Sequence, residues 1–398
     1  MKLSKIALAT LATVAAVATM SAPLHAQELK IALIAGKTGA LEAYAKETEI
    51  GFMMGLEYLT GGKMEINGRK IKVIVKDDQG KPDLAKAALS EAYGDDKVDI
   101  AVGTTSSGAA LAMLPVAEEY KKVLVVEPAV ADAITGDKWN RYIFRTGRNS
   151  SQDGLAAAAA LMDDVNVAFL AQDYAFGRDG VKAFKDSLAA VKSKAKVVHE
   201  EYAPQTATDF TASAQRIFDA LKDKPGRKIL SIYWAGPNPL TKIADMKPER
   251  YGIELAAGGN ILPVLKGWKN LSGMEGSIYY YYAFPKNKMN DWLVTENQKR
   301  LKQPPDFFTA GGFAAASAVV TAITKAGSTD SEKLIAAMEG MDFETPKGKM
   351  SFRKDDHQAL QPMYHFRIKK TQANEWDLLE LVREIPAAEL PLPIRNKR

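Results

Sequence analysis

The chain has 398 residues, of which 46% are hydrophobic and 25% charged, and it carries a formal net charge of +5 with no cysteine. These values are typical of a globular protein of roughly two domains, and they exclude stabilisation by disulfides. The small positive excess is scattered along the sequence, which argues against a nucleic-acid partner.

The first 26 residues have the pattern of a secretory signal. Lys2 and Lys5 precede an apolar run over residues 6–20, and a zone of mostly small residues ends at Ala26. Cleavage after Ala26 lowers the net charge from +5 to +3, because it removes two lysines and no acid. Without a cysteine there is no lipid anchor at the cleavage site, so we expect a freely diffusing periplasmic protein. No later apolar run approaches bilayer length, and no transmembrane segment is expected.

From residue 28 onwards, short apolar runs alternate with longer amphipathic ones. The expected strands are 30–35, 70–75, 99–102 and 123–126, and the expected helices are 42–59, 83–93 and 109–120. Strands that alternate with helices predict a parallel sheet with helices on its faces.

A second series of the same kind follows residue 147. Its expected strands are 165–170, 195–199, 228–233 and 277–282, and its expected helices are 178–191, 208–221 and 308–325. Two similar units and a late return segment predict an α/β protein with two lobes, several crossings and a ligand cleft between the lobes.

The end of the chain departs from this rhythm. Residues 348–353 and 363–368 alternate in the manner of strands, and the polar turn 354–358 lies between them, so a closing hairpin is expected. We assign 27–147 with 283–352 to the first lobe, and 148–282 with 353–398 to the second.

One loop has the groups to hold a small anion. Thr105, Ser106 and Ser107 follow the strand 99–102 and precede the helix 109–120. In an open parallel sheet the carboxyl ends of the strands face the ligand crevice. Hydroxyls next to the free N–H groups of a helix N-terminus suit a carboxylate.

Groups for catalysis are missing from the pattern. No nucleophile, base and orienting group can be assembled, and His199, His357 and His365 are not spaced as metal ligands. The sequence predicts a protein that is not an enzyme, with no catalytic residue, no metal and no cofactor.

Four motifs follow one another along the chain: IALIAGKTG (31–39), VGTTSSG (102–108), DYAFG (173–177) and the segment 343–352. In the order and spacing of these motifs, the chain resembles the branched-chain-amino-acid type of periplasmic solute-binding protein, which has the type I two-lobed fold and serves an ABC importer. The resemblance covers essentially the whole mature chain.

The resemblance implies that the first lobe holds the carboxylate of the ligand. The matching positions are Ser106 and Ser107 in the first loop, and Ala129 and Ala131 after the next strand. Amino-acid-binding members commonly have a threonine where Ala131 stands. The absence of this threonine argues against an amino acid as the ligand. Tyr44 matches an aromatic position in the first-lobe loop.

In the second lobe the family closes aromatic side chains over the ligand and pairs an acid with the ammonium group. The matching aromatic residues are Phe176 and Trp234, with Tyr174 nearby. No acid stands near Gly259 and Asn260, although an ammonium buried without an anionic partner is costly. Asn260 instead suits a neutral oxygen. Arg148, at the lobe junction, is a candidate contact for the ligand or its hydration shell, and the alternative is a hinge or surface charge.

The segments 127–131, 173–178 and 279–282 are most similar to members that bind lignin-derived aromatic acids. The resemblance therefore implies capture of a benzoate derivative, such as 4-hydroxybenzoate, vanillate or protocatechuate, and delivery to a membrane permease. The lobes are expected to close by a hinge motion, and the protein to act as a monomer. The alternatives are a branched-chain or other amino acid as ligand, a ligand sensor with the same fold, and a secreted enzyme.

Overall fold

The first lobe is built on a six-stranded sheet. The computed structural model describes residues 28–397, so the predicted leader lies outside the described residues. The strand order is β2-β3-β1-β4-β5-β6, and all neighbours are parallel except the β2–β3 pair. The strands are β1 (Leu29–Ala35), β2 (Glu65–Ile66), β3 (Arg69–Asp77), β4 (Ile100–Gly103), β5 (Leu124–Val126) and β6 (Ile143–Arg145). The central strand β1 is almost entirely buried, as its continuous apolar run predicts.

Helices cover this sheet, and two of them pack unusually closely. The helices are α1 (Glu42–Leu59), α2 (Pro82–Gly94), α3 (Ser107–Tyr120), α10 (Phe307–Ala326) and α11 (Ser331–Met338). A Cβ on Gly51 of α1 would lie 1.8 Å from the carbonyl oxygen of Thr309, and one on Gly312 of α10 would lie 2.0 Å from that of Thr48. Glycine at these positions lets the two backbones touch, which brings the start of α10 close to α1.

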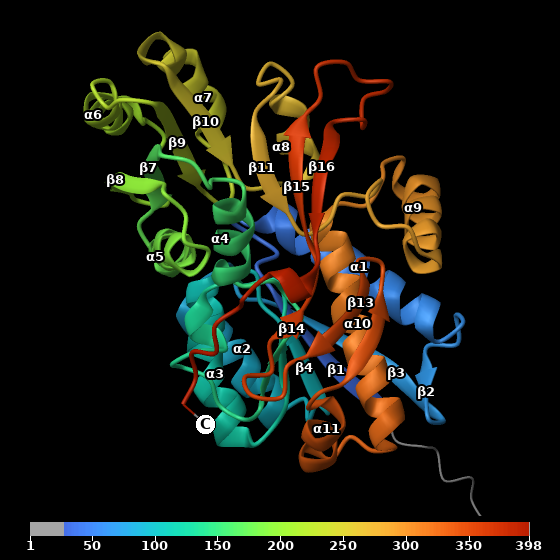
Figure 1. The fold of residues 1–398 in the computed structure, drawn as a ribbon. Coiled ribbons are helices and arrows are strands. Elements are labelled where there is room, and N and C mark those ends of the chain that lie inside the picture. Colours follow the sequence, from blue (N-terminus) through green and yellow to red (C-terminus); the bar gives the residue numbers. More distant parts are fainter. Residues whose placement is uncertain (1–27, 398) are drawn as a thin grey trace, which may run out of the picture.

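The second lobe holds a parallel sheet in the order β10-β9-β7-β8 and a three-stranded antiparallel sheet in the order β11-β15-β16 (Figure 1). The strands are β7 (Val165–Gln172), β8 (Lys196–Ala203), β9 (Arg227–Tyr233), β10 (Ile253–Ala257), β11 (Glu275–Ile278), β15 (Met363–Ile368) and β16 (Leu379–Ile385). The helices are α4 (Ser150–Ala159), α5 (Ala175–Ala190), α6 (Thr211–Leu221), α7 (Leu240–Asp245) and α8 (Leu262–Gly267).

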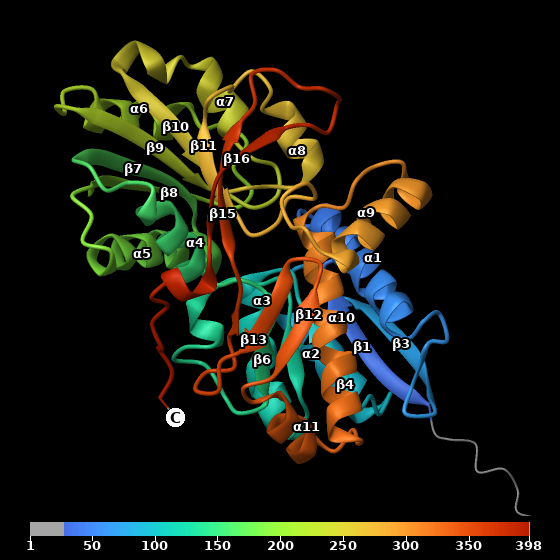
Figure 2. The same ribbon diagram turned by 45° about the vertical axis from the view of Figure 1, so that its right-hand side comes forward.

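The return segment belongs to the first lobe. Arg300 of α9 (Lys288–Leu301) pairs with Glu57 of α1 at 2.7 Å, and the ring of Trp292 packs on Tyr58. A small antiparallel sheet follows, made of β12 (Asp342–Thr345), β13 (Gly348–Phe352) and β14 (Ala359–Leu360). Figure 2 shows it beside α10, with the second lobe above.

Three expectations about the late chain need correction. The strand expected over 277–282 ends at Ile278. The expected hairpin does not form, because β13 pairs with β12 and β14 whereas β15 pairs with β11 and β16. The assigned lobe boundary at residue 352 is also too early, since β14 pairs with β13 of the first lobe and Gln358 bridges to Arg145.

The expectation that no later apolar run approaches bilayer length is wrong for α10. This helix of 20 residues is long and apolar enough to cross a membrane, but 89% of its most apolar window is buried inside the protein. It therefore has the burial of a core helix of the first lobe.

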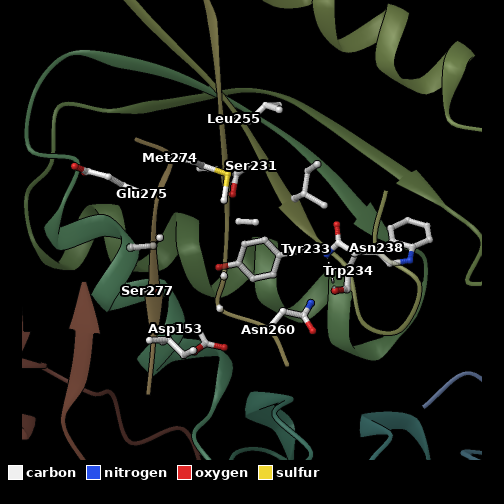
Figure 3. A pocket seen from close by; sticks show the side chains of 18 of the residues that line it. Asp153, Ser231, Tyr233, Trp234, Asn238, Leu255, Asn260, Met274, Glu275 and Ser277 are labelled. Carbon is white, nitrogen blue, oxygen red and sulfur yellow. Dashed lines mark hydrogen bonds between the residues drawn. The ribbon is translucent and has the colours of Figure 1, made fainter. Parts of the chain in front are cut away.

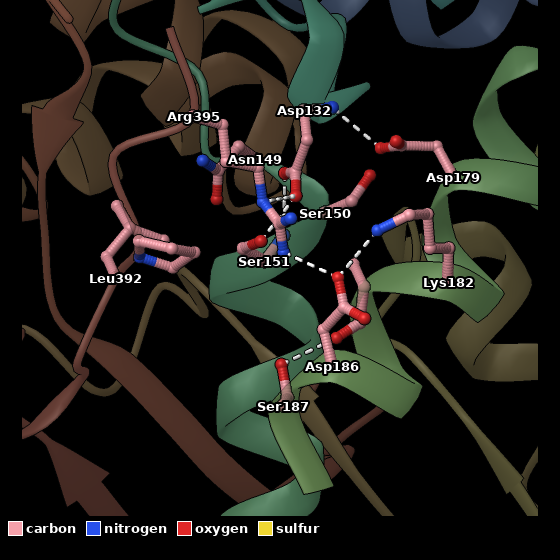
Figure 4. A network of polar contacts seen from close by, with 12 residues as sticks. Asp132, Asn149, Ser150, Ser151, Asp179, Lys182, Asp186, Ser187, Leu392 and Arg395 are labelled. Carbon is pink, nitrogen blue, oxygen red and sulfur yellow. Dashed lines mark hydrogen bonds and ion pairs between the residues drawn. The ribbon is translucent and has the colours of Figure 1, made fainter. Parts of the chain in front are cut away.

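The chain passes between the lobes three times: between β6 and α4, between β11 and α9, and between β14 and β15. The C-terminal tail adds a further contact between the lobes. Figure 4 shows Arg395 between Asp132 of the first lobe and Asp186 of α5, with ion pairs of 3.3 and 2.8 Å. The backbone N–H of Asp132 also donates to Asp179 of α5 at 2.6 Å. The lobes are therefore in contact beside the crossings.

Candidate functional site

A cavity of about 930 Å³ lies between the lobes and continues into the second lobe. Side chains from both lobes line it, together with residues of two crossings and the first turn of α10. Figure 3 shows Ser231, Leu255 and Met274 on one side of the cavity, Asp153 and Asn260 on the other, and Tyr233 between them.

The first-lobe wall offers hydroxyl groups. The Oγ of Ser107, at the start of α3, accepts hydrogen bonds from the backbone N–H groups of Val130 (3.3 Å) and Ala131 (3.2 Å). Its own proton remains free to donate into the cavity. The Oγ1 of Thr105 is buried and has no partner among the described residues. Both hydroxyls can therefore donate to an anionic ligand.

A row of aromatic rings lines the cleft. Tyr44 packs on Phe308 with the ring centroids 4.6 Å apart, Phe308 stacks on Phe307 at 4.2 Å, and Phe307 meets Tyr279 edge-on at 5.0 Å. All four residues line the cavity, which gives a ligand ring several flat surfaces to contact.

Arg148 stands where the first crossing enters the cavity. Its Nε donates to Asp153 at 3.2 Å, and its guanidinium lies 4.8 Å from the ring centroid of Tyr279. The side chain is only 13% exposed, and the two Nη atoms have no hydrogen-bond partner among the described residues. A guanidinium of this kind presents N–H groups suited to a bidentate carboxylate.

A buried polar cluster lies under Arg148. Burial raises the pKa of Asp153 and of Glu127, and it lowers the pKa of Lys347 to about 8. The Nζ of Lys347 donates to Gln361 at 2.7 Å and lies 4.9 Å from the ring centroid of Tyr279. The charges around the cavity are thus held in a largely dry environment, where electrostatic interactions are strong.

The second-lobe wall is also aromatic. The ring of Phe176 lies 6.0 Å from that of Tyr174 and 6.3 Å from that of Tyr233. The Tyr233 hydroxyl has no hydrogen-bond partner within residues 28–397, and burial raises its pKa. Trp234 is 5% exposed and packs edge-on against Phe210 in the core, so it contributes less surface to the cavity.

Tyr44 connects the two lobes. Its hydroxyl accepts a hydrogen bond from the backbone N–H of Gly236 (2.9 Å) and donates to Oδ1 of Asn260 (3.0 Å). Burial raises the pKa of this hydroxyl to about 12, so it stays protonated. With the contacts of Asp132, these bonds join the two lobes across the cleft.

Most of the predicted site residues line one cavity. They are Tyr44, Thr105, Ser107, Arg148, Tyr174, Phe176, Trp234, Gly259 and Asn260. The residues Ser106, Ala129 and Ala131 are buried but are not part of the lining. Of the alternatives for Arg148, a surface charge is excluded, because its side chain is only 13% exposed at the cleft. Whether these residues contact the ligand stays a prediction.

The sequence reasoning missed Tyr233, Phe307 and Phe308. The alternation of β9 was a signal for Tyr233, because it places Tyr233 on the same face of the strand as Ser231 and Ile229. The two phenylalanines have no comparable signal, since they begin a helix that reads as core throughout.

Fold and site together define a two-lobed binding protein with a cavity between its lobes. A family model described as "Periplasmic binding protein" matches residues 28–373. The chain belongs to this family, and it is a periplasmic solute-binding protein of the ABC-transporter class. A small-molecule ligand and a membrane permease as partner follow from this membership.

Known relatives are similar over nearly the whole chain. The Leu/Ile/Val-binding protein BraC3 of Rhizobium johnstonii is 26% identical, over 83% of this chain and 89% of its own length. The crystal structure of an ABC-type branched-chain amino acid transporter from Rhodopseudomonas palustris is 68% identical, covers 93% of this chain and 100% of its own, and has a TM-score of 0.82. A solute-binding protein from Rhodopseudomonas palustris BisB5, solved with 3,4-dihydroxy benzoic acid, is 26% identical, covers 92% and 99%, and has a TM-score of 0.79.

Proposed function

We propose that this protein captures a small aromatic carboxylate, of the benzoate type, and delivers it to an ABC permease. The observation that carries the proposal is Arg148, a buried guanidinium in the cleft whose Nη donors have no partner among the described residues. A ligand carboxylate supplies the acceptor that these donors lack.

The surroundings of Arg148 suit the rest of such a ligand. Thr105 and Ser107 add hydroxyl donors from the first lobe, and rings from both lobes offer apolar faces. Offset or edge-on contacts between aromatic rings contribute roughly 0.5–1.5 kcal/mol per pair beyond burial. The relative solved with 3,4-dihydroxy benzoic acid supports the same ligand class.

Capture requires movement of the lobes. The hydrogen bonds of Tyr44 and Asp132 join the lobes across the cleft, and these bonds break when the lobes separate. A ligand that binds both walls shifts the equilibrium towards the closed form, which we propose the permease recognises.

An amino acid is the second candidate ligand, and Asp153 is the observation that favours it. Asp153 lines the cavity and its carboxylate could pair with an ammonium group, a role for which the sequence suggested no acid. The named relatives include binding proteins for leucine, isoleucine and valine. Against this ligand, Asp153 is already bonded to Arg148.

A thermal-shift and calorimetric panel separates the two ligands. The panel contains 4-hydroxybenzoate, 3,4-dihydroxybenzoate and L-leucine, with 4-hydroxybenzamide as the uncharged control. A ligand that binds only the native state, at a concentration a hundred times its dissociation constant, adds about 2.7 kcal/mol to the unfolding free energy. We expect this shift for the two acids and none for the amide. Tighter binding of leucine, or equal binding of the amide, overturns the proposal.

A further inference from the structure

The interlobe cavity has a deep arm that runs inside the second lobe, away from the cleft. One wall is helix α4, where Asp153, Ala156, Ala157 and Ala160 line the cavity. Their i, i+3, i+4, i+7 spacing places them on one face of the helix. With a rise of 1.5 Å per residue, this stripe extends roughly 10 Å from the cleft.

The opposite wall is the sheet of the second lobe. Ile229, Ser231 and Tyr233 occupy alternate positions of β9 and line the same cavity, whereas Leu230 on the other face is buried in the core. Ile232, also on that other face, reaches the cavity near the end of the strand. Strand β9 lies between β10 and β7, yet Ser231 and Tyr233 are only partly buried. An inner strand with solvent-accessible side chains indicates space that the protein does not fill.

The small side chains of α4 explain the space. Five alanines follow one another over 156–160, so the helix presents methyl groups where larger residues would pack against β9. Met274 and Gly276 of the β11 region form part of the remaining lining. The walls of the arm are therefore mainly apolar, with Ser231 as a hydroxyl on one side.

Two carboxylates at the far end are paired with arginines, Glu254 with Arg227 at 2.7 Å and Glu275 with Arg367 at 2.6 Å. The other charged residues of this part of the lining, Asp245, Lys247 and Glu249, are exposed and therefore hydrated. The arm therefore does not require a second charge on its occupant. A cavity of about 930 Å³ is also near the upper end of the range for drug-sized ligands, far larger than a single-ring acid.

We infer that the arm is a subsite for an apolar extension of the ligand, so that the protein prefers aromatic carboxylates with a para-alkyl chain to benzoate itself. This inference rests on the proposed function, because the carboxylate is taken to bind at Arg148. The chain then extends along the alanine stripe of α4.

Calorimetry with benzoate and with 4-methyl-, 4-ethyl-, 4-propyl- and 4-butylbenzoate tests the inference. Each buried methylene is expected to tighten binding roughly fourfold. In the Ala157→Leu variant, the ratio of affinities for 4-butylbenzoate and benzoate is expected to fall at least tenfold. Ser231→Leu narrows the arm from the opposite wall and gives the same result if Ala157→Leu does not fold.

Ala159→Leu is the matched control. Ala159 is on the same helix and outside the cavity lining, so this variant should keep the wild-type ratio. If benzoate binds but affinity does not rise with chain length, or if the three variants change the ratio equally, the subsite is refuted and the proposed function stands. If no aromatic acid binds, both fail.

Discussion

Replacing Arg148 by glutamine tests the electrostatic part of the proposed site. The substitution removes the guanidinium and keeps a long polar side chain. The Arg148 side chain is 13% exposed and Asp153 is 19% exposed, so the charges around a bound carboxylate are poorly hydrated. Truncating one partner of such a pair typically costs 2–5 kcal/mol. We therefore expect the dissociation constant for 4-hydroxybenzoate to rise at least about 30-fold.

Two further variants show whether the loss is due to the carboxylate contact. Arg148→Lys keeps the positive charge without the planar fork, so we expect an intermediate affinity. Asp153→Asn removes the same ion pair but leaves the guanidinium, so it should bind the acid at least as tightly as the wild type. If an amino acid is the ligand, Asp153→Asn instead abolishes binding.

Isothermal titration calorimetry of the four proteins is the assay, with thermal unfolding to confirm that each variant is folded. The Arg148→Gln substitution also leaves the buried Asp153 carboxylate without its cation, which lowers the stability of the protein whether or not a ligand is bound. Binding by Arg148→Gln within twofold of the wild type would refute the reasoning, because the carboxylate would then be held elsewhere.

Three other substitutions address closure and the buried charges. Tyr44→Phe removes the hydroxyl that forms hydrogen bonds with Gly236 and Asn260. The closed form should lose about 1–3 kcal/mol of stability, so the apparent affinity for the ligand, measured by calorimetry, should fall roughly tenfold. An unchanged affinity would show that these bonds do not stabilise the bound form. Arg395→Ala removes the ion pairs with Asp132 and Asp186. The pair with Asp186 is partly exposed and worth about 0.2–1 kcal/mol, whereas Asp132 is only 8% exposed and is left without this cation. The variant should bind a few-fold more weakly at low salt, and a difference that does not shrink in high salt would contradict this. Lys347→Met tests how the stability of the protein depends on pH. Burial lowers the pKa of Lys347 to about 8 in the native state, whereas its pKa in the unfolded chain is about 10.5. Because the unfolded state binds more protons between these values, wild-type unfolding free energy should rise with pH relative to the variant, by up to about 1.4 kcal/mol per pH unit. If the unfolding free energies of the two proteins, measured with urea, change with pH in the same way from pH 8 to 10, this expectation is refuted.

Local patterns were sufficient for the elements and for part of the site. The expected helix 42–59 matches α1, and the run 30–35 lies within β1, because periodicity and apolar continuity are properties of neighbouring residues. The loop that holds Thr105 and Ser107 was identified in the same way, as a polar turn between a buried strand and a helix. Such features need no knowledge of distant contacts.

Strand partners could not be read locally. The segments now seen as β13 and β15 alternate in the same manner and are separated by a turn, yet they belong to different sheets. Alternation specifies a pleated strand with one buried face, but the neighbour depends on which lobe covers that face. The lobe boundary was misplaced for the same reason.

Patterns along the chain were enough to predict a two-lobed α/β protein, a hydroxyl-bearing loop and a set of aromatic residues suited to a cleft. Which of these groups meet depends on the tertiary fold. It brought Phe307 and Phe308 beside Tyr44 through the close packing of α1 and α10, and it buried Arg148 at the crossing. The arm along α4 is also a tertiary property, because an alanine run leaves space only where the opposite wall does not fill it.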